Sequence, residues 1–90
     1  MLTLPATLGL AEAPLWVDRL QEELRNQNAE SVVVDAAALT RFDSSALAVL
    51  LQVRREAARA RRPFILRGAS SKLLALAELY GVREMLGVAS

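Results

Sequence analysis

A short polar segment, Thr40–Ser45, holds the residues of this chain that are best placed to do chemistry. Asp43 is a natural N-cap, so Ser44 and Ser45 fall in the first turn of a helix that begins there. The hydroxyl of Ser44 then lies at the positive end of the helix dipole, where free backbone N–H groups would stabilise a phosphate. The carboxylate of Asp43 would oppose a phosphate by like-charge repulsion. The residues alone leave two interpretations open, a plain capping turn and a phosphoacceptor at Ser44.

Other catalytic chemistry has little support in the composition. The chain contains no Cys and no His, which removes thiolate nucleophiles, His bases and the usual zinc and haem sites. Asp35 and Asp43 form a conceivable carboxylate pair, but no set of metal ligands accompanies them in the sequence. The four glycines are isolated, so the sequence has no phosphate-binding loop. We expect a protein that is not an enzyme and that binds no metal or cofactor.

Length, charge and hydropathy narrow the class of protein further. Ninety residues suffice for one small domain, and a composition that is 53% hydrophobic but only 4% aromatic predicts a core of Leu, Val and Ala. The formal net charge of +1 gives no general attraction to nucleic acid or to an anionic membrane. The longest uncharged runs, Met1–Ala11 and Ser44–Val53, are about half of the ~20 residues that cross a bilayer. We therefore expect a soluble cytoplasmic protein without a nucleic-acid partner.

Three helices are predicted from the spacing of apolar residues. The first runs from about Glu12 to Asn26–Asn28, with a Pro that is tolerated in its first turn. The second covers 44–60 and begins at the polar segment. The third covers 69–80, with Gly81 as its stop.

The strands are predicted from short apolar runs between these helices. Ser31–Asp35 and 64–66 show no alternation, the pattern of strands that are covered on both faces, and the first of them is expected in the middle of the sheet. Residues 2–10 suit a short edge strand and a loop, and 82–86 a short tail element. This order predicts an α/β fold, with one domain over residues 1–90 and a small, mainly parallel or mixed sheet against which three main helices pack.

The predicted helix over 44–60 has two different faces. At 100° per residue, one face is expected to dock on the sheet. This face carries Ala46, Val49, Leu50, Val53, Ala57 and Ala60. The opposite side presents Ser44, Leu51 and Arg55, with Leu47 on its flank. Burying one exposed leucine in a partner contributes roughly 1.5–3 kcal/mol, which is enough to seed an interface; the alternative is that arginine stems cover the leucines.

The predicted helix over 69–80 extends this outer surface. Its inward stripe is expected to be Leu73, Leu76, Ala77 and Tyr80. Leu74 is then turned toward solvent, and Leu79 is a further candidate for a solvent-facing position. If both helices lie on the same side of the sheet, their outward residues form one docking patch for a protein partner. The predicted patch consists of Leu47, Leu51 and Leu74, framed by Ser44, Arg55 and Lys72.

A cluster of arginines follows the second helix. Six of the eleven basic residues lie between Arg54 and Arg67, a span that contains a single acid, Glu56. Such a cluster suits a solvated helix end, whose cations complement the negative end of the dipole, or a contact with an anionic surface. Since the chain has few aromatic residues on which bases could stack, an acidic protein surface is favoured over nucleic acid.

The polar segment and its neighbours also resemble a known family. The stretches VVVDAAALTRFDSSALAVLLQVRR and LLALAELYGV are similar to the STAS domain family, and the likeness covers nearly the whole chain. Residues 76–82 are similar to MlaB-type members, the small cytoplasmic subunits of the Mla phospholipid-transport ABC complex. The resemblance implies a non-catalytic subunit that binds the ATPase of such a complex, supports its assembly and activity, and meets the membrane only through the complex. The residues expected at this interface are Asp43, Ser44, Ser45, Leu47, Leu51, Arg55 and Leu74.

A second branch of the family keeps an alternative open. In anti-sigma factor antagonists, the first Ser or Thr after the Asp is phosphorylated by an anti-sigma factor kinase, and Ser44 matches that position. Many members carry glycines where this chain has Ala46 and Ala48. Members also open with a β-hairpin, so the first strand is expected to be missing or very short here. A homodimer formed through the same patch is a third alternative.

Overall fold

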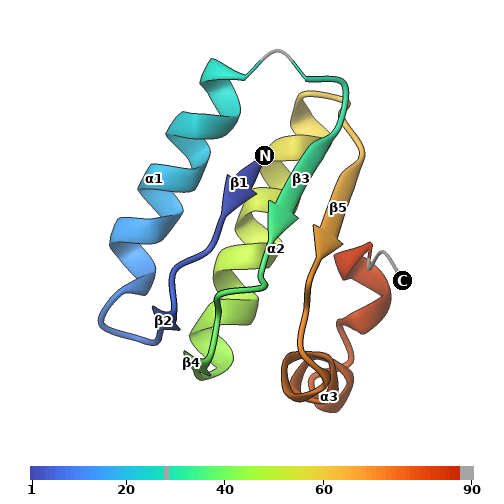
Figure 1. The fold of residues 1–90 in the computed structure, drawn as a ribbon. Coiled ribbons are helices and arrows are strands. Elements are labelled where there is room, and N and C mark those ends of the chain that lie inside the picture. Colours follow the sequence, from blue (N-terminus) through green and yellow to red (C-terminus); the bar gives the residue numbers. More distant parts are fainter. Residues whose placement is uncertain (28, 88–90) are drawn as a thin grey trace.

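The computed structural model of the chain describes residues 1–27 and 29–87, in which short strands lie between the helices along the sequence (Figure 1). The strands are β1 (Leu2–Thr3), β2 (Thr7–Leu8), β3 (Val32–Asp35), β4 (Arg41–Phe42) and β5 (Phe64–Arg67). The helices are α1 (Ala13–Asn26), α2 (Ser44–Arg59), α3 (Ser71–Leu79) and the short 3-10 helix η1 (Arg83–Leu86). The three predicted helices and the short tail element are therefore all present.

The strands form two small sheets in which every described pair is parallel. The larger sheet has the order β1-β3-β5, with Val33 beside Ile65 and Asp35 beside Arg67. The smaller sheet pairs β2 with β4. Strand β3 is the central strand and β1 is a short edge strand, as predicted. The arrangement confirms the predicted α/β fold with a small, mainly parallel sheet.

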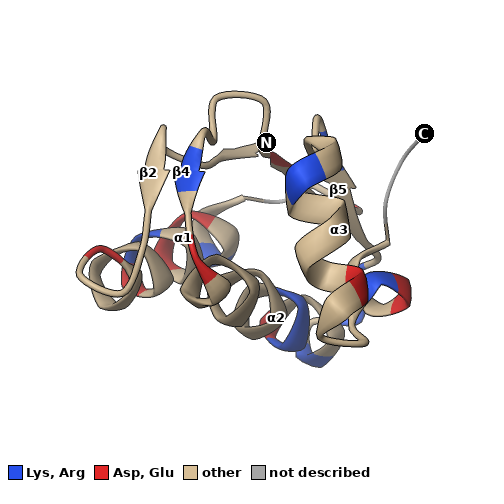
Figure 2. Ribbon diagram, turned by 90° about the horizontal axis from the view of Figure 1, so that it is seen from below, with Lys and Arg blue, Asp and Glu red and all other residues tan. Residues whose placement is uncertain are grey.

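The two long helices lie on one side of the larger sheet. Helix α2 runs behind the strands in Figure 1 and α1 lies beside it, while Figure 2 shows both helices in one layer below the strands. Helix α3 lies at the end of the sheet where β3 and β5 finish, next to the amino end of α2 (Figure 1). Connections that follow parallel strands meet at this end, so the topology places the polar segment beside α3.

Aliphatic side chains fill the space between the larger sheet and the helices. The largest fully buried ones come from every layer of the fold and include Leu2, Leu20, Leu50, Leu66 and Leu73. Across the described part of the chain, no polar or charged side chain is fully buried. The predicted core of Leu, Val and Ala is therefore confirmed.

The prediction that β3 and β5 are covered on both faces is wrong. Val32, Val34 and Leu66 point toward the helices and are buried, whereas Val33 and Ile65 are only half-buried and lie outside the core cluster. Both long helices pack on the same side, so no helix of the described residues covers the other face (Figure 1). The run of β-branched residues in β3 therefore reflects strand propensity as well as burial.

Candidate docking groove between helices α2 and α3

Helix α2 begins at a capping turn that follows β4 directly. The Oδ1 of Asp43 accepts a hydrogen bond from the backbone N–H of Ser45 at 2.7 Å, which is an N-cap contact. Hydrogen bonds from Ser45 hold the pKa of the Asp43 carboxyl below its ordinary value, so it is ionised at neutral pH. Ser44, the first residue of α2, is exposed, and Ser45 is half-buried. The predicted capping role of Asp43 is confirmed.

The second oxygen of the same carboxylate holds the loop between β2 and α1. The Oδ2 of Asp43 accepts a hydrogen bond from the backbone N–H of Leu10 at 3.3 Å. The N–H of Gly9 donates to Glu12 Oε1 at 2.9 Å, and a Cβ added to Gly9 would lie 3.3 Å from the same Oδ2. The loop therefore packs closely against the start of α2, and it leaves the side chain of Leu10 77% exposed.

A groove of about 480 Å³ opens between the start of α2 and one side of α3. We call it the α2–α3 groove. Its α2 side is formed by Phe42, Asp43 and Ser44. Its α3 side is formed by Lys72, Ala75, Leu76, Leu79 and Tyr80. The groove is therefore mainly apolar, with one acid, one base and two hydroxyl-bearing residues in its lining.

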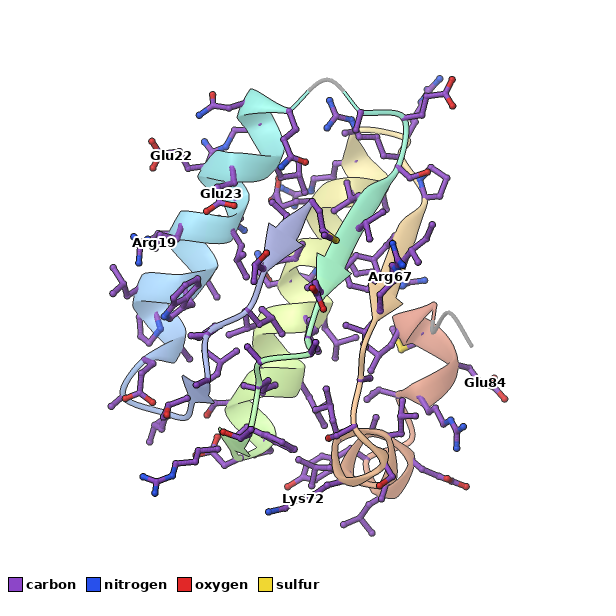
Figure 3. All side chains as sticks on the ribbon, in the orientation of Figure 1. Arg19, Glu22, Glu23, Arg67, Lys72 and Glu84 are labelled. Carbon is purple, nitrogen blue, oxygen red and sulfur yellow. The ribbon has the colours of Figure 1, made fainter. Side chains whose placement is uncertain are left out.

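Two large side chains of the α3 side are exposed to solvent. Leu79 is 78% exposed and Tyr80 is 58% exposed, while Leu76 is half-buried against the core. Lys72 extends from α3 toward the amino end of α2 (Figure 3), and its Nζ lies 5.7 Å from the centre of the Phe42 ring. A cation over an aromatic face is a favourable contact, so Lys72 is held at the rim of the groove.

The predicted docking patch needs correction on helix α2. Leu47 was expected on the outer flank, but it is only 3% exposed and belongs to the core. Leu51 is half-buried and packs against the same core. The reason is that α2 is contacted by α1 and η1 as well as by β5 of the sheet, so its buried arc is wider than one face. Arg55 is exposed as predicted, and Ala60, expected in the core, is exposed at the helix end.

The predicted patch also needs correction on helix α3. Leu74 is half-buried and is not part of the groove lining, because at 100° per residue it lies 200° around the helix from Leu76. Tyr80, expected to point inward, is the exposed C-cap of α3. Leu73 and Ala77 are buried as predicted. Of the residues expected at the interface or around the docking patch, Asp43, Ser44 and Lys72 line the groove.

The sequence contained a signal for the α3 side of the groove. Lys72, Leu76, Leu79 and Tyr80 are spaced as i, i+4, i+7 and i+8, which is one stripe of a helix. Of these residues, Leu76 and Tyr80 are expected on the inward stripe, whereas Lys72 is expected at the rim of the docking patch and Leu79 is a candidate for a solvent-facing position. Since α3 buries mainly Leu73 and Ala77, that stripe is left to line the groove instead.

Two arginines of the cluster make contacts within the fold. Arg59 pairs with Glu56 at 3.3 Å, and Arg62 donates to the backbone oxygen of Leu24 at 3.1 Å, which ties the end of α2 to α1. Arg55 and Arg61 are exposed. In residues 1–27 and 29–87, no three acidic side chains gather as a cluster that could hold a metal ion. A helix long and apolar enough to span a membrane does not occur in this part of the chain either.

Comparison with known proteins identifies the family. A family model described as "Mlab, STAS domain" matches residues 1–87. Curated proteins gave no match to this chain. Because the family model covers nearly the whole sequence, the chain belongs to the STAS domain family, whose domains act as protein-interaction modules.

Proposed function

We propose that this STAS-family chain, as one domain over residues 1–90, is a non-catalytic subunit of the MlaB type. In this proposal it is a cytoplasmic protein that binds the ATPase of a phospholipid-transport ABC complex and supports its activity, and it reaches the membrane only through that complex. The observation that carries the proposal is the exposure of Leu79 and Tyr80 beside the capped start of α2. Large apolar side chains next to a polar rim are typical of a protein-docking surface.

The energetics of the α2–α3 groove suit a protein partner. Burying Leu79 in an interface would contribute roughly 1.5–3 kcal/mol, and Tyr80 adds an aromatic surface with a hydrogen-bonding hydroxyl. Ser44 and Lys72 at the rim supply polar contacts that fix the orientation of the partner. Asp43, the only acid in the lining, already accepts two backbone hydrogen bonds. The groove is therefore better suited to binding than to acid–base catalysis.

Co-purification with the ATPase tests this proposal. Leu79→Asp places a charge on the exposed wall of the groove and is expected to abolish co-purification while the domain stays folded. The matched control is Leu15→Asp, since Leu15 is 61% exposed on α1, which α2 separates from the groove (Figure 2). Leu51→Asp is a poorer variant, because Leu51 packs against the core and its loss would destabilise the fold.

The co-purification result shows whether the ATPase docks in the α2–α3 groove. Loss of the ATPase with Leu79→Asp but not with Leu15→Asp supports docking through the α2–α3 groove. Retention of the ATPase by a folded Leu79→Asp variant, in amounts equal to the wild type, contradicts it. Circular dichroism of each variant establishes that the domain is folded.

The alternative function, an anti-sigma factor antagonist switched by phosphorylation, is favoured by one observation. Ser44 is exposed at the first position of α2, within reach of an incoming kinase, and it lines the groove. A phosphate there would add about 1.5–2 negative charges at the rim and change which partner can bind. Incubation with a cognate anti-sigma factor kinase and ATP should then add one phosphoryl group to the wild type and to Ser45→Ala. An unmodified wild type, or equal modification of Ser44→Ala, would count against this alternative.

A further inference from the structure

The larger sheet has a second face that takes no part in the α2–α3 groove. On β3 and β5, alternate side chains point away from the helices: Val33 and Asp35 from β3, Ile65 and Arg67 from β5. Figure 1 shows this face toward the viewer with no helix in front of it, and Figure 3 shows Arg67 on it. A sheet with one face open and apolar residues on it is a candidate interaction surface.

The side chains of this open face form matched neighbouring pairs. Val33 lies directly beside Ile65, and Asp35 lies directly beside Arg67, so an apolar pair is followed by a pair of opposite charges. Within the described residues, Asp35 and Arg67 form no ion pair with each other. Asp35 Oδ1 accepts the N–H of Ala37 at 2.9 Å, which leaves its second oxygen available.

We propose that the open face pairs with the open face of a second copy of this chain. Consider a two-fold axis that is parallel to the strands and lies above the open face, over the midline between β3 and β5. Rotation about that axis places β5 of the second copy over β3 of the first. Since Asp35 and Arg67 lie at the same level of the two strands, Arg67 of the second copy then faces Asp35, and the reverse holds on the other strand.

The same rotation brings the apolar residues together. Val33 of one copy faces Ile65 of the other, because these two residues are also in register. Stacked sheets are about 10 Å apart, a distance that a valine, an isoleucine and an arginine side chain fill from both sides. The face is thus complementary to itself in both charge and hydropathy, as a two-fold interface requires.

The size of the face sets the expected strength of the dimer. Four outward residues from β3 and β5, with Met1 and Thr3 at the edge, are far fewer than the roughly 20–30 residues per partner in a standard interface. The dimer is therefore weak and forms only at high protein concentration. The α2–α3 groove lies at the end of the sheet and remains accessible to another partner in each copy.

Sedimentation equilibrium of the chain alone, over about 10 μM to 1 mM, tests the proposal, because this range covers weak dissociation constants. The wild type is expected to dimerise as the concentration rises. Arg67→Glu places like charges opposite each other twice and should raise the dissociation constant by about tenfold or more. Arg67→Lys should change it little, and Ile65→Lys should abolish the dimer.

Leu79→Asp is the matched control, since Leu79 lies in the groove and not on the open face. It should leave the dimer unchanged. A wild type that stays monomeric throughout the range overturns the proposal. A dimer that survives Arg67→Glu, or one that is lost with Leu79→Asp, overturns it as well, because the contact would then lie elsewhere. None of these outcomes depends on the ATPase partner.

Discussion

The backbone N–H of Leu10 donates to the Oδ2 of Asp43 at 3.3 Å, a contact between residues that are 33 positions apart in the chain. The other oxygen of this carboxylate caps α2 through the N–H of Ser45. One side chain therefore fixes both the start of α2 and the loop that precedes α1. Since Asp43 also lines the α2–α3 groove, the shape of the groove depends on its ionised form.

Asp43 should make the stability of the domain depend on pH. Its folded-state pKa is lowered by hydrogen bonds from Ser45, so its contribution is present above the unfolded pKa of about 3.9 and is lost as the pH falls through the folded value. Asp43→Asn keeps a capping side chain but does not titrate. The Tm of the wild type should exceed that of Asp43→Asn at neutral pH, and the difference should shrink in acid.

Thermal unfolding followed by circular dichroism, from about pH 6 to about pH 2, measures this difference across the range in which carboxyl groups titrate. Asp43→Ala serves as the control for the cap itself and should have the lowest Tm at neutral pH. Parallel curves of Tm against pH for the wild type and Asp43→Asn would contradict the account.

The cap of α3 holds one wall of the groove. Ser70 Oγ accepts the N–H of Leu73 at 3.1 Å, and replacing such a cap by Ala costs about 1 kcal/mol of unfolding free energy. Urea denaturation of Ser70→Ala should show this loss. Ser71→Ala, one residue later on an exposed position, should stay within about 0.5 kcal/mol of the wild type. Equal stabilities of the two variants would show that the cap is not formed.

The carboxyl end of α2 carries a backbone conformation that is costly for its residue. Arg61 has a φ of +56°, and the N–H groups of Arg61 and Arg62 bond to Ala58 and Ala57, the pattern in which glycine is usual. Helix α3 ends in the same way with Gly81. Arg61→Gly should therefore raise the free energy of unfolding by about 0.5–1 kcal/mol, after the extra backbone entropy of glycine is subtracted.

Gly81→Ala is the matched variant for Arg61→Gly and should lower stability by about 1 kcal/mol. Both changes can be measured by urea denaturation at neutral pH. A destabilised Arg61→Gly variant would mean that contacts of the arginine side chain stabilise the fold by more than its backbone strain costs.

Leu47 and Leu79 should respond in opposite ways to truncation. Leu47 is 3% exposed, so Leu47→Ala leaves a cavity and should cost about 2–5 kcal/mol. Leu79 is 78% exposed, so Leu79→Ala should change stability by less than about 0.5 kcal/mol. Denaturant unfolding of the two variants checks the corrected assignment of α2 and α3 faces. A tolerated Leu47→Ala would restore Leu47 to the docking surface.

These two leucines also show where sequence reasoning succeeds and fails. The helices, the central strand at Val32–Asp35 and the cap at Asp43 follow from local spacing and residue type, and all three were predicted. The burial of Leu47 was not predictable from its own helix, because α1 and η1 contact α2 as well as the sheet. A helical wheel reports the direction of a side chain, but not how many neighbours the helix has.

The groove was missed for a related reason. Leu76 and Tyr80 belong to the inward stripe of α3 that the helical wheel assigns to the core. Helix α3 lies at the end of the sheet rather than along its face (Figure 1), so only one edge of that stripe is buried. Tertiary placement of this kind depends on the loops around β4 and β5. Only the position of Asp43 and Ser44 beside α3 was implied by the parallel topology.

Hydrogen–deuterium exchange of the chain with and without the ATPase locates the docking surface on the chain. Residues 42–46 and 71–80, the two walls of the α2–α3 groove, should exchange more slowly when the complex forms. Strand β3 and the carboxyl half of α1 should show unchanged exchange and serve as internal references. Protection confined to α1 or to the open face of the sheet, with the groove segments unchanged, would contradict the claim that this groove is the docking site.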